Sequence, residues 1–203
     1  NLFDYFSLMK KTLILLLFPF LGIGQTNKEI VSKEKILTIF YNVENLFDTI
    51  NNPDTNDDEF IPTSEKKWNS KRYYHKINQL SKVFSSLIKD KNINKMPAFI
   101  GLCEIENKQV INDLLKTPTF SNHNYKIIHK DGPDKRGIDC ALLYNKKIQL
   151  LYYDFILVNN PSAKRPTRDI LYAKFKLHDN TVNLFINHWP SRWGGQEESN
   201  YKR

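Results

Sequence analysis

The sequence predicts an α+β protein in which helices lie outside packed β-sheets. Short apolar runs rich in Ile, Val, Phe and Tyr recur along the chain, and turn-forming residues separate them, as is typical of strands. Two other segments place apolar residues on one helical face. The order is strand, helix, strand, helix and then mostly strands, which favours an α+β arrangement. A chain of 203 residues fits one domain with a sizeable core.

Each element has its own local signal. Strands are predicted at residues 36–41, 98–103, 125–129, 138–144, 149–158, 171–177 and 182–187. Helices are predicted over residues 71–89 and 108–116, where apolar residues recur every three or four positions. Asn69 or Ser70 is the expected N-cap of the first helix. The second helix is expected to end before Pro118.

The N-terminal residues have the pattern of a secretory signal peptide. A basic segment that begins at Met9 precedes an apolar run over residues 13–23, and small residues lead into Gln25. This run is shorter than the ~20 residues of a membrane-spanning helix. We therefore assign residues 1–24 to upstream sequence plus a signal peptide, and residues 25–203 to the domain. We expect a periplasmic or extracellular protein without a membrane span after signal cleavage.

The composition limits the partner and the redox chemistry. The formal net charge of +8 suits a polyanion such as nucleic acid, another phosphodiester or an anionic membrane surface. In the basic stretch 66–76, Trp68 or Tyr73 could stack on bases, although such a stretch is also typical of a solvated helix start. Export would permit a disulfide between Cys103 and Cys140, but both lie in apolar runs, so we predict free, buried thiols.

Polar residues follow three of the apolar runs, which indicates a site at one edge of the sheets. Glu104 comes directly after a buried run, where a carboxylate is costly unless it is paired, hydrogen-bonded or bound to metal. Asn42 follows another run, where a simple turn is the alternative. His188 can donate or accept a proton near neutral pH, and Asn187 and Arg192 beside it could hold an anionic oxygen.

Two other sets of polar residues receive no role from the sequence. The acidic segment 54–65 resembles part of a calcium loop, but Glu59 stands where such a loop needs glycine, so we predict a solvated acidic loop. The remaining histidines lack partners in the sequence; they are His75, His123, His129 and His178.

Five motifs add up to a resemblance to a known family. They read FYNVENLFD, GLCEIEN, KRGIDCALLY, RPTRDIL and FINHWPSR, and they occur between Ile36 and the C-terminus. Together they resemble the endonuclease/exonuclease/phosphatase superfamily, the group of deoxyribonuclease I, exonuclease III and sphingomyelinase. The resemblance implies a four-layer α/β sandwich, in which helices flank two packed mixed sheets and the site lies at one end. It also implies metal-assisted hydrolysis of a phosphodiester.

The resemblance also implies residue roles. Glu104 would be the main carboxylate ligand of Mg²⁺ (or Mn²⁺ or Ca²⁺), with Asn42 and Glu44 beside it. His188 would protonate or stabilise the scissile phosphate. Arg168 would contact the phosphate, and Asp139 and Arg136 would orient the substrate.

The family's later motifs, an Asp-x-Asn strand end and an Asp-His pair, do not follow His188 in this sequence. We therefore expect a C-terminally truncated chain that is inactive and poorly stable by itself. Its parent is expected to be an exported, monomeric, metal-dependent phosphodiesterase, most simply an endonuclease. A sphingomyelinase-like or inositol-phosphatase-like enzyme and a non-catalytic nucleic-acid-binding fragment remain the alternatives.

Overall fold

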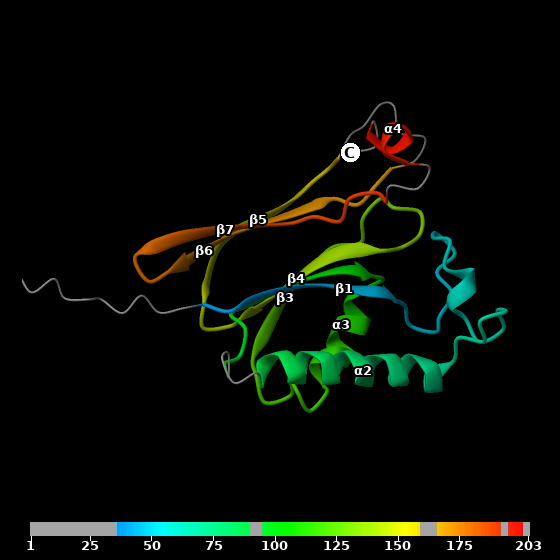
Figure 1. The fold of residues 1–203 in the computed structure, drawn as a ribbon, viewed down its shortest axis with the longest axis horizontal. Coiled ribbons are helices and arrows are strands. Elements are labelled where there is room, and N and C mark those ends of the chain that lie inside the picture. Colours follow the sequence, from blue (N-terminus) through cyan, green and yellow to red (C-terminus); the bar gives the residue numbers. More distant parts are fainter. Residues whose placement is uncertain (1–35, 90–94, 159–165, 192–194, 201–203) are drawn as a thin grey trace, which may run out of the picture. The chain divides into compact units, whose positions relative to one another are not determined.

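The computed structural model describes residues 36–89, 95–158, 166–191 and 195–200. Strands in this part of the chain form two sheets (Figure 1). In spatial order, sheet A contains β1 (Thr38–Leu46), β2 (Phe99–Ile105), β4 (Asp139–Asn145) and β3 (Tyr125–His129). Sheet B contains β5 (Gln149–Ile156), β6 (Ile170–Leu177) and β7 (Asn180–Ile186). The helices are η1 (Asp58–Phe60), α2 (Ser70–Ile88), α3 (Lys108–Leu115) and α4 (Gly195–Asn200).

This architecture confirms the predicted α+β class. Sheet A is mixed, because β1 runs parallel to β2 and the other neighbours are antiparallel. Sheet B is antiparallel throughout its described strands. Every predicted strand and helix is present, but β1 continues beyond residue 41 to Leu46. Asn42 and Glu44 therefore lie within this strand and not after it.

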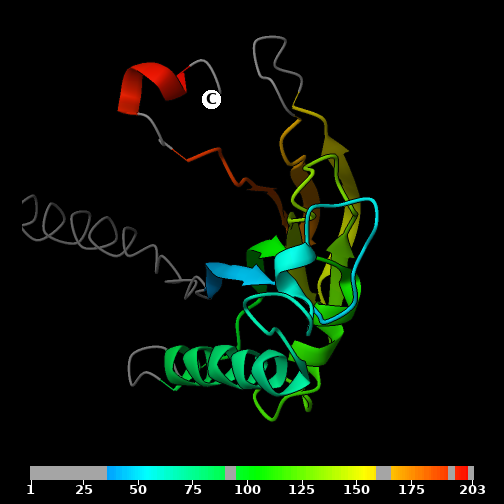
Figure 2. The same ribbon diagram turned by 90° about the vertical axis from the view of Figure 1, so that its right-hand side faces the viewer.

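The elements form layers, with α2 and α3 on one side of sheet A and sheet B on the other (Figures 1 and 2). One core lies between the helices and sheet A, and its largest members include Tyr73, Ile77, Phe84, Leu102 and Phe120. A second core lies between the two sheets and includes Phe99, Cys140, Tyr144, Leu171 and Phe175. Because β2 contacts both cores, nearly all its side chains are buried, which explains its almost unbroken apolar run.

Gly101 allows β7 to come close to β2. A β-carbon at this position would lie 2.7 Å from Cδ1 of Ile186, which is the final residue of β7. A side chain at position 101 would therefore push the end of β7 away from sheet A. Since His188 follows Ile186 by two residues, this contact brings the histidine to the same edge of the sheets as Glu104.

The two thiols are free and buried, as predicted. Cys103 and Cys140 face each other in the register of β2 and β4, and both belong to the core between the sheets. Burial raises the pKa of Cys103 to about 11 and that of Cys140 to about 12, so both thiols stay protonated near neutral pH.

Side-chain caps fix the starts of the two longer helices. Asn69 accepts a hydrogen bond from the Arg72 N–H at 3.2 Å, which confirms Asn69 as the cap of α2. Asn107 caps α3 in the same way by accepting from the Val110 N–H at 3.1 Å. None of the described helices combines the length and hydropathy needed to span a bilayer. The predicted signal peptide lies outside the described residues.

Candidate active site

The carboxylate of Glu104 is held at the end of the parallel pair β1 and β2. Its Oε1 accepts a hydrogen bond from Asn42 Nδ2 at 3.1 Å, and its Oε2 accepts from the Asn45 N–H at 2.9 Å. The carboxyl ends of parallel strands meet at one sheet edge, so residues far apart in the sequence come together here. Two donors, one on each oxygen, fix the orientation of this carboxylate.

The backbone around this carboxylate is left-handed at three non-glycine residues. The φ angles are 58° at Glu44, 59° at Asn45 and 65° at Glu104. The pairing register shifts at the same places, between Asn42 and Leu46 on β1 and between Cys103 and Ile105 on β2. Bulges of this kind redirect side chains, and unfavourable φ values persist where the surroundings enforce them. This distortion turns Glu104 out of the buried pattern of β2.

Lys76 of α2 forms hydrogen bonds with the distorted segment of β1. Its ammonium donates to the carbonyl oxygen of Glu44 and to that of Asn45, the latter at 3.2 Å. Burial lowers the pKa of Lys76. The sequence contained no signal for this role beyond the basic character of the stretch 66–76.

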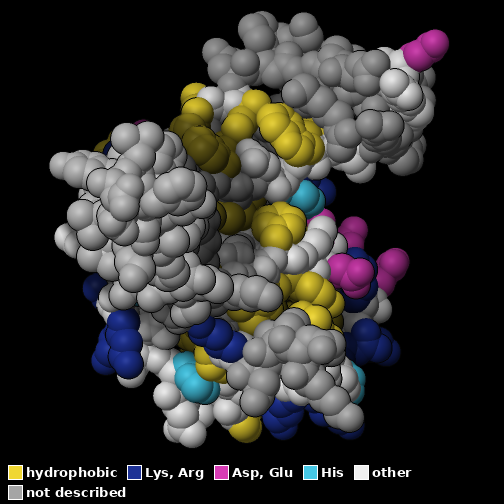
Figure 3. All heavy atoms as spheres, turned by 60° about the vertical axis from the view of Figure 1, so that its left-hand side comes forward, with side chains coloured by type: hydrophobic (Ala, Val, Ile, Leu, Met, Phe, Trp, Pro, Cys, Tyr) yellow, Lys and Arg dark blue, Asp and Glu magenta, His cyan; other side chains and the backbone are white. Residues whose placement is uncertain are grey.

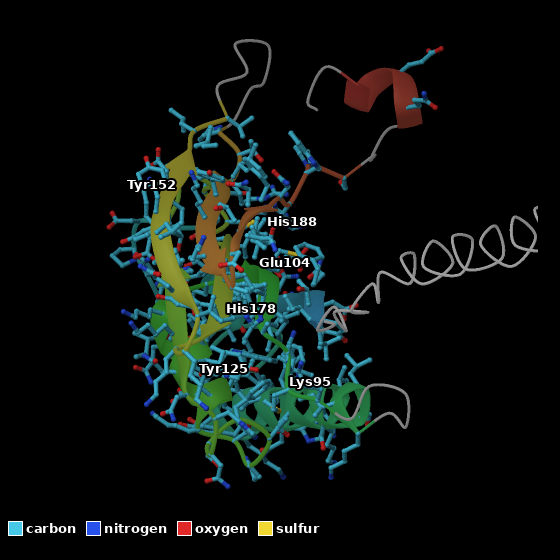
Figure 4. The ribbon with its side chains drawn as sticks, turned by 90° about the vertical axis from the view of Figure 1, so that its left-hand side faces the viewer. Lys95, Glu104, Tyr125, Tyr152, His178 and His188 are labelled. Atoms are coloured by element: carbon cyan, nitrogen blue, oxygen red, sulfur yellow. The ribbon has the colours of Figure 1, made fainter. Side chains whose placement is uncertain are left out.

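His188 lies beside Glu104, with its Nε2 3.3 Å from Glu104 Oε1, and Figure 4 shows the two residues close together. The Nδ1 atom is buried and has no hydrogen-bond partner within the described part of the chain. Burial, followed by the positive charge of Arg168, lowers the pKa of His188. The imidazole is therefore held close to a carboxylate but favours its neutral form near pH 7.

Arg168 positions His188 through the backbone. Its Nη2 donates to the carbonyl oxygen of His188 at 2.5 Å, and its Nη1 donates to Asp134 Oδ2 at 2.9 Å. Asp134 also accepts hydrogen bonds from Arg136. The Arg136 side chain is about half exposed. Arg168 itself is 5 % exposed, and its two contacts tie the turn after β7 to Asp134 in the segment between β3 and β4.

The other residues predicted for the site are placed differently. The Glu44 side chain is exposed, and the hydrogen bonds of this residue run through its backbone. Asn187 donates weakly to the Phe185 carbonyl oxygen at 3.5 Å. Asp139 is buried in a neighbouring cavity, and Arg192 lies outside the described residues. The structure thus brings Asn42, Glu104, His188 and Arg168 together, while Asp139 lines the neighbouring cavity.

The cavity that contains Asp139 also contains Glu106, and both carboxyl groups titrate abnormally. Burial raises the pKa of Glu106 to about 8 and that of Asp139 to about 7. Neighbouring carboxylates add to both shifts, with Asp48 foremost for Glu106 and Asp131 foremost for Asp139. Without bound cations, these groups therefore keep protons that ordinary carboxyl groups lose.

These shifts predict a fold that loses stability as the pH rises. Between the ordinary pKa of Glu106, 4.5, and its raised value of about 8, the folded chain binds a proton that the unfolded chain has released. The free energy of unfolding should therefore fall across this window, and Glu106→Gln should reduce the fall. Urea unfolding at pH 5 and pH 8 in the presence of chelator measures the effect. The exposed Glu65→Gln is the control, and equal pH dependence in both variants would contradict the prediction.

Comparison with known proteins is consistent with the predicted resemblance. Residues 37–203 match the family described as "Endonuclease/Exonuclease/phosphatase family". No curated protein matches the chain. Among solved structures, truncated Caenorhabditis elegans TDP2 is 18 % identical with a TM-score of 0.39, and the match covers 58 % of this chain and 41 % of that one. Selenomethionine TDP2 from the same organism gives the same identity and TM-score, and the match covers 60 % of this chain and 32 % of that one. The chain thus spans less than half the length of either structure. The family match over residues 37–203 shows that the chain belongs to the endonuclease/exonuclease/phosphatase family.

Proposed function

We propose that this protein hydrolyses phosphodiesters with the help of a divalent metal ion and that it cleaves nucleic acid internally. The observation that carries the proposal is the Glu104 carboxylate, oriented by Asn42 and Asn45 and facing His188. Family membership supports the same chemistry.

The residues around Glu104 fit a hard divalent cation. Glu104 offers two carboxylate oxygens, and the Asn42 amide oxygen, which accepts the Glu44 N–H at 2.8 Å, keeps a second lone pair. Carboxylate and amide oxygens are ligand types that Mg²⁺, Mn²⁺ and Ca²⁺ accept. Nε2 of His188 is a further polar atom at the same place, 3.3 Å from Glu104 Oε1. When bound, the ion would stabilise negative charge on a phosphate oxygen.

The chain's own groups supply orientation and proton transfer. His188 can donate a hydrogen bond or a proton to an oxygen of a phosphate bound beside Glu104. Arg168 fixes the backbone of His188, and Lys76 fixes the backbone on the other side of Glu104. Both cations thus act as positioning residues, because each donates a hydrogen bond to a main-chain oxygen next to the site.

A basic groove favours nucleic acid as the substrate. It has a volume of about 970 Å³ at the start of α2 and is lined by Trp68, Asn69, Ser70, Lys71, Arg72, Tyr74, His75, Lys76 and Asn78. Lys76 links this groove to the segment that holds Glu104. Figure 3 shows Lys and Arg side chains around the lower part of the molecule, where Figure 1 places the helices. Cations that follow a strand of phosphates, with an aromatic side chain for base stacking, are typical of nucleic-acid grooves.

The aromatic residue suited to stacking differs from the two considered in the sequence. Tyr73 is 4 % exposed and its hydroxyl donates a hydrogen bond to Asp113 at 2.9 Å. The hypothesis that Tyr73 stacks on bases is therefore wrong, because its ring is buried. Trp68 is half-buried and donates its indole N–H to the Phe47 carbonyl oxygen. Tyr74 lines the groove and is 52 % exposed, so we assign the stacking contact to Tyr74.

The proposal is tested by a substrate panel on the full-length protein. Supercoiled DNA, single-stranded DNA, RNA, sphingomyelin and an inositol phosphate are each incubated with Mg²⁺ and with chelator. We expect metal-dependent cuts within closed circular DNA. Hydrolysis of sphingomyelin or inositol phosphate alone would replace the nuclease proposal with the corresponding phosphoesterase. DNA binding without cleavage would leave a binding protein.

The groove makes a separate prediction. Lys71→Ala combined with Arg72→Ala should raise KM for DNA and leave kcat nearly unchanged, because these cations contact substrate away from the reacting phosphate. The salt dependence of DNA affinity should also become shallower, by about 0.7–0.9 in logarithmic slope for each lost phosphate contact. Lys82→Ala, an exposed lysine of the same helix outside the groove, is the matched control. An unchanged slope in the double variant would remove the groove from the substrate path.

We also propose export to the periplasm or the extracellular space, which is supported by the basic and apolar pattern of residues 9–24. N-terminal sequencing of the mature protein tests it. A new N-terminus near Gln25 is expected, and a retained Met9 in the mature protein would contradict export by signal cleavage.

A further inference from the structure

A second cavity rich in carboxylates lies beside the Glu104 site. It has a volume of about 310 Å³ and lies between residues 48–55, the end of β2 and residues 131–139. Four acidic side chains line it, and they are Asp48, Glu106, Asp131 and Asp139. The chain carries a net charge of +8, so this gathering of negative charge runs against its overall composition.

Two side chains of this cavity, Asp131 and Asp139, have the spacing of metal ligands together with the neighbouring His129. His129, Asp131 and Asp139 each offer one ligand atom, and these atoms lie within 4.8 Å of one another. His129 ends β3 and Asp139 begins β4, which are neighbouring antiparallel strands. The His129 side chain is 3 % exposed and its Nδ1 lies 3.9 Å from Asp131 Oδ1.

Two buried polar atoms in this region lack a hydrogen-bond partner among the described residues. One is Nε2 of His129, the ring nitrogen opposite the Nδ1 that faces Asp131, and the other is Oδ1 of Asp57. Asp57 is 1 % exposed, and its second oxygen accepts the N–H of Asn52, a residue that lines the cavity. Buried polar groups are nearly always satisfied by protein, water or an ion, so these atoms call for a partner.

The carboxylates here also lack the cations that other buried carboxylates of this protein have. Asp134 pairs with Arg136 and Arg168, and Asp169 pairs with Lys130. Within the described part of the chain, Asp57, Glu106 and Asp139 are as deeply buried but form no ion pair with Lys or Arg. A buried carboxylate without a cation is costly, and a bound metal ion is one way to remove that cost.

We propose that this cavity binds a divalent transition-metal ion, such as Zn²⁺ or Mn²⁺, through His129, Asp131 and Asp139. An imidazole with two carboxylates suits these ions better than Mg²⁺, which prefers oxygen ligands only. Glu106 and Asp48 lie at the same cavity and supply further negative charge. This site is separate from Glu104 and does not depend on the proposed hydrolytic function.

The position of the ion gives it a structural role. The segment after β1 already contacts the segment before β4, because the Asn56 N–H donates to the Lys135 carbonyl oxygen at 2.7 Å. An ion at His129, Asp131 and Asp139 sits where these two segments meet. Because its ligands come from the end of β3, the loop after it and the start of β4, the ion would fix this loop against the segment after β1 that it contacts.

The test counts bound ions on the metal-free full-length protein. Mn²⁺ is titrated and monitored by electron paramagnetic resonance, and thermal unfolding is recorded with and without Zn²⁺. We expect Glu104→Gln to keep one Mn²⁺ site. We also expect Zn²⁺ to raise the Tm of this variant by several degrees, because an ion that binds only the folded state stabilises it. Asp131→Asn and His129→Gln should weaken this remaining site by about 10-fold or more and abolish the rise in Tm.

The variants are chosen so that a folding defect does not obscure the outcome. The Asp131 side chain is 83 % exposed, so its substitution leaves the packing intact. Asp54→Asn, an exposed change in the neighbouring segment, is the matched control and should bind as the unmodified protein does. A Zn²⁺ effect on Tm that persists in Asp131→Asn and His129→Gln would overturn the proposal. So would the absence of any Mn²⁺ site in Glu104→Gln, whatever the outcome of the nuclease assay.

Discussion

Glu104→Gln is expected to reduce metal-dependent cleavage of DNA by about 10³-fold. The substitution keeps the size of the side chain but removes the negative charge that would hold the cation. It also replaces one acceptor oxygen by an amide group that faces the donors of Asn42 and Asn45. Loss of the metal's charge stabilisation is worth several kcal/mol in the transition state, and about 4 kcal/mol corresponds to the stated factor. Initial rates at saturating Mg²⁺ measure it.

A folded but inactive variant is the informative result for Glu104. Circular dichroism and thermal unfolding should show that Glu104→Gln retains the fold, and the exposed Glu65→Gln should retain full activity. Cleavage by Glu104→Gln at the unmodified rate would show that Glu104 does not hold the catalytic cation, even if other members of the site were correct.

His188→Ala is expected to lower kcat by about 10²–10⁴-fold, which is the usual contribution of a general acid or base. The reason is the position of its Nε2 beside Glu104, in reach of any phosphate bound there. The dependence of kcat/KM on pH should lose the limb that reports His188, and in the unmodified enzyme this limb should lie below the ordinary histidine pKa of 6.5 because burial lowers the value.

The exposed loop residue His123 provides the matched control, since His123→Ala removes an imidazole far from any strand end of the site. A His188→Ala variant whose rate falls by the expected factor but whose pH profile is unchanged would assign His188 a positioning role. Full activity would remove His188 from the reaction.

The sequence predicted the elements well because each has a strong local signal. The β2 run FIGLCEI is apolar throughout since both of its faces are buried, and α2 shows a helical stripe since only one face meets sheet A. The end of β1 was less accurate. Asn42 and Glu44 interrupt the apolar pattern, whereas Val43 and Leu46 remain buried and carry the strand onward.

The site was predictable only in part, for a physical reason. Strand-end polar residues indicated Asn42, Glu104 and His188, because strand ends that share a sheet edge bring their side chains together. The left-handed backbone at Glu44, Asn45 and Glu104 and the support from Lys76 depend on tertiary contacts that leave no local pattern. The same holds for the His129, Asp131 and Asp139 group, whose members come from two strands and the loop between them.

The acidic segment 54–65 shows how one pattern can cover different environments. Asp54, Asp58 and Glu59 are exposed, as expected of a solvated loop. Asp57, within the same run, is buried and accepts the Asn52 N–H. Composition cannot distinguish them, because the difference arises from how the loop folds back on itself.

The separation of the site residues along the chain has a consequence for biosynthesis. Asn42 and Glu104 are 62 positions apart, and His188 reaches Glu104 only after β7 has docked on Gly101. Contacts between such distant segments form late in folding, since closing long loops is entropically unfavourable. A nascent chain with helices and sheet A alone would hold Glu104 and Asn42 but no His188. The proposed hydrolysis would thus be latent in a nascent chain until β7 is in place.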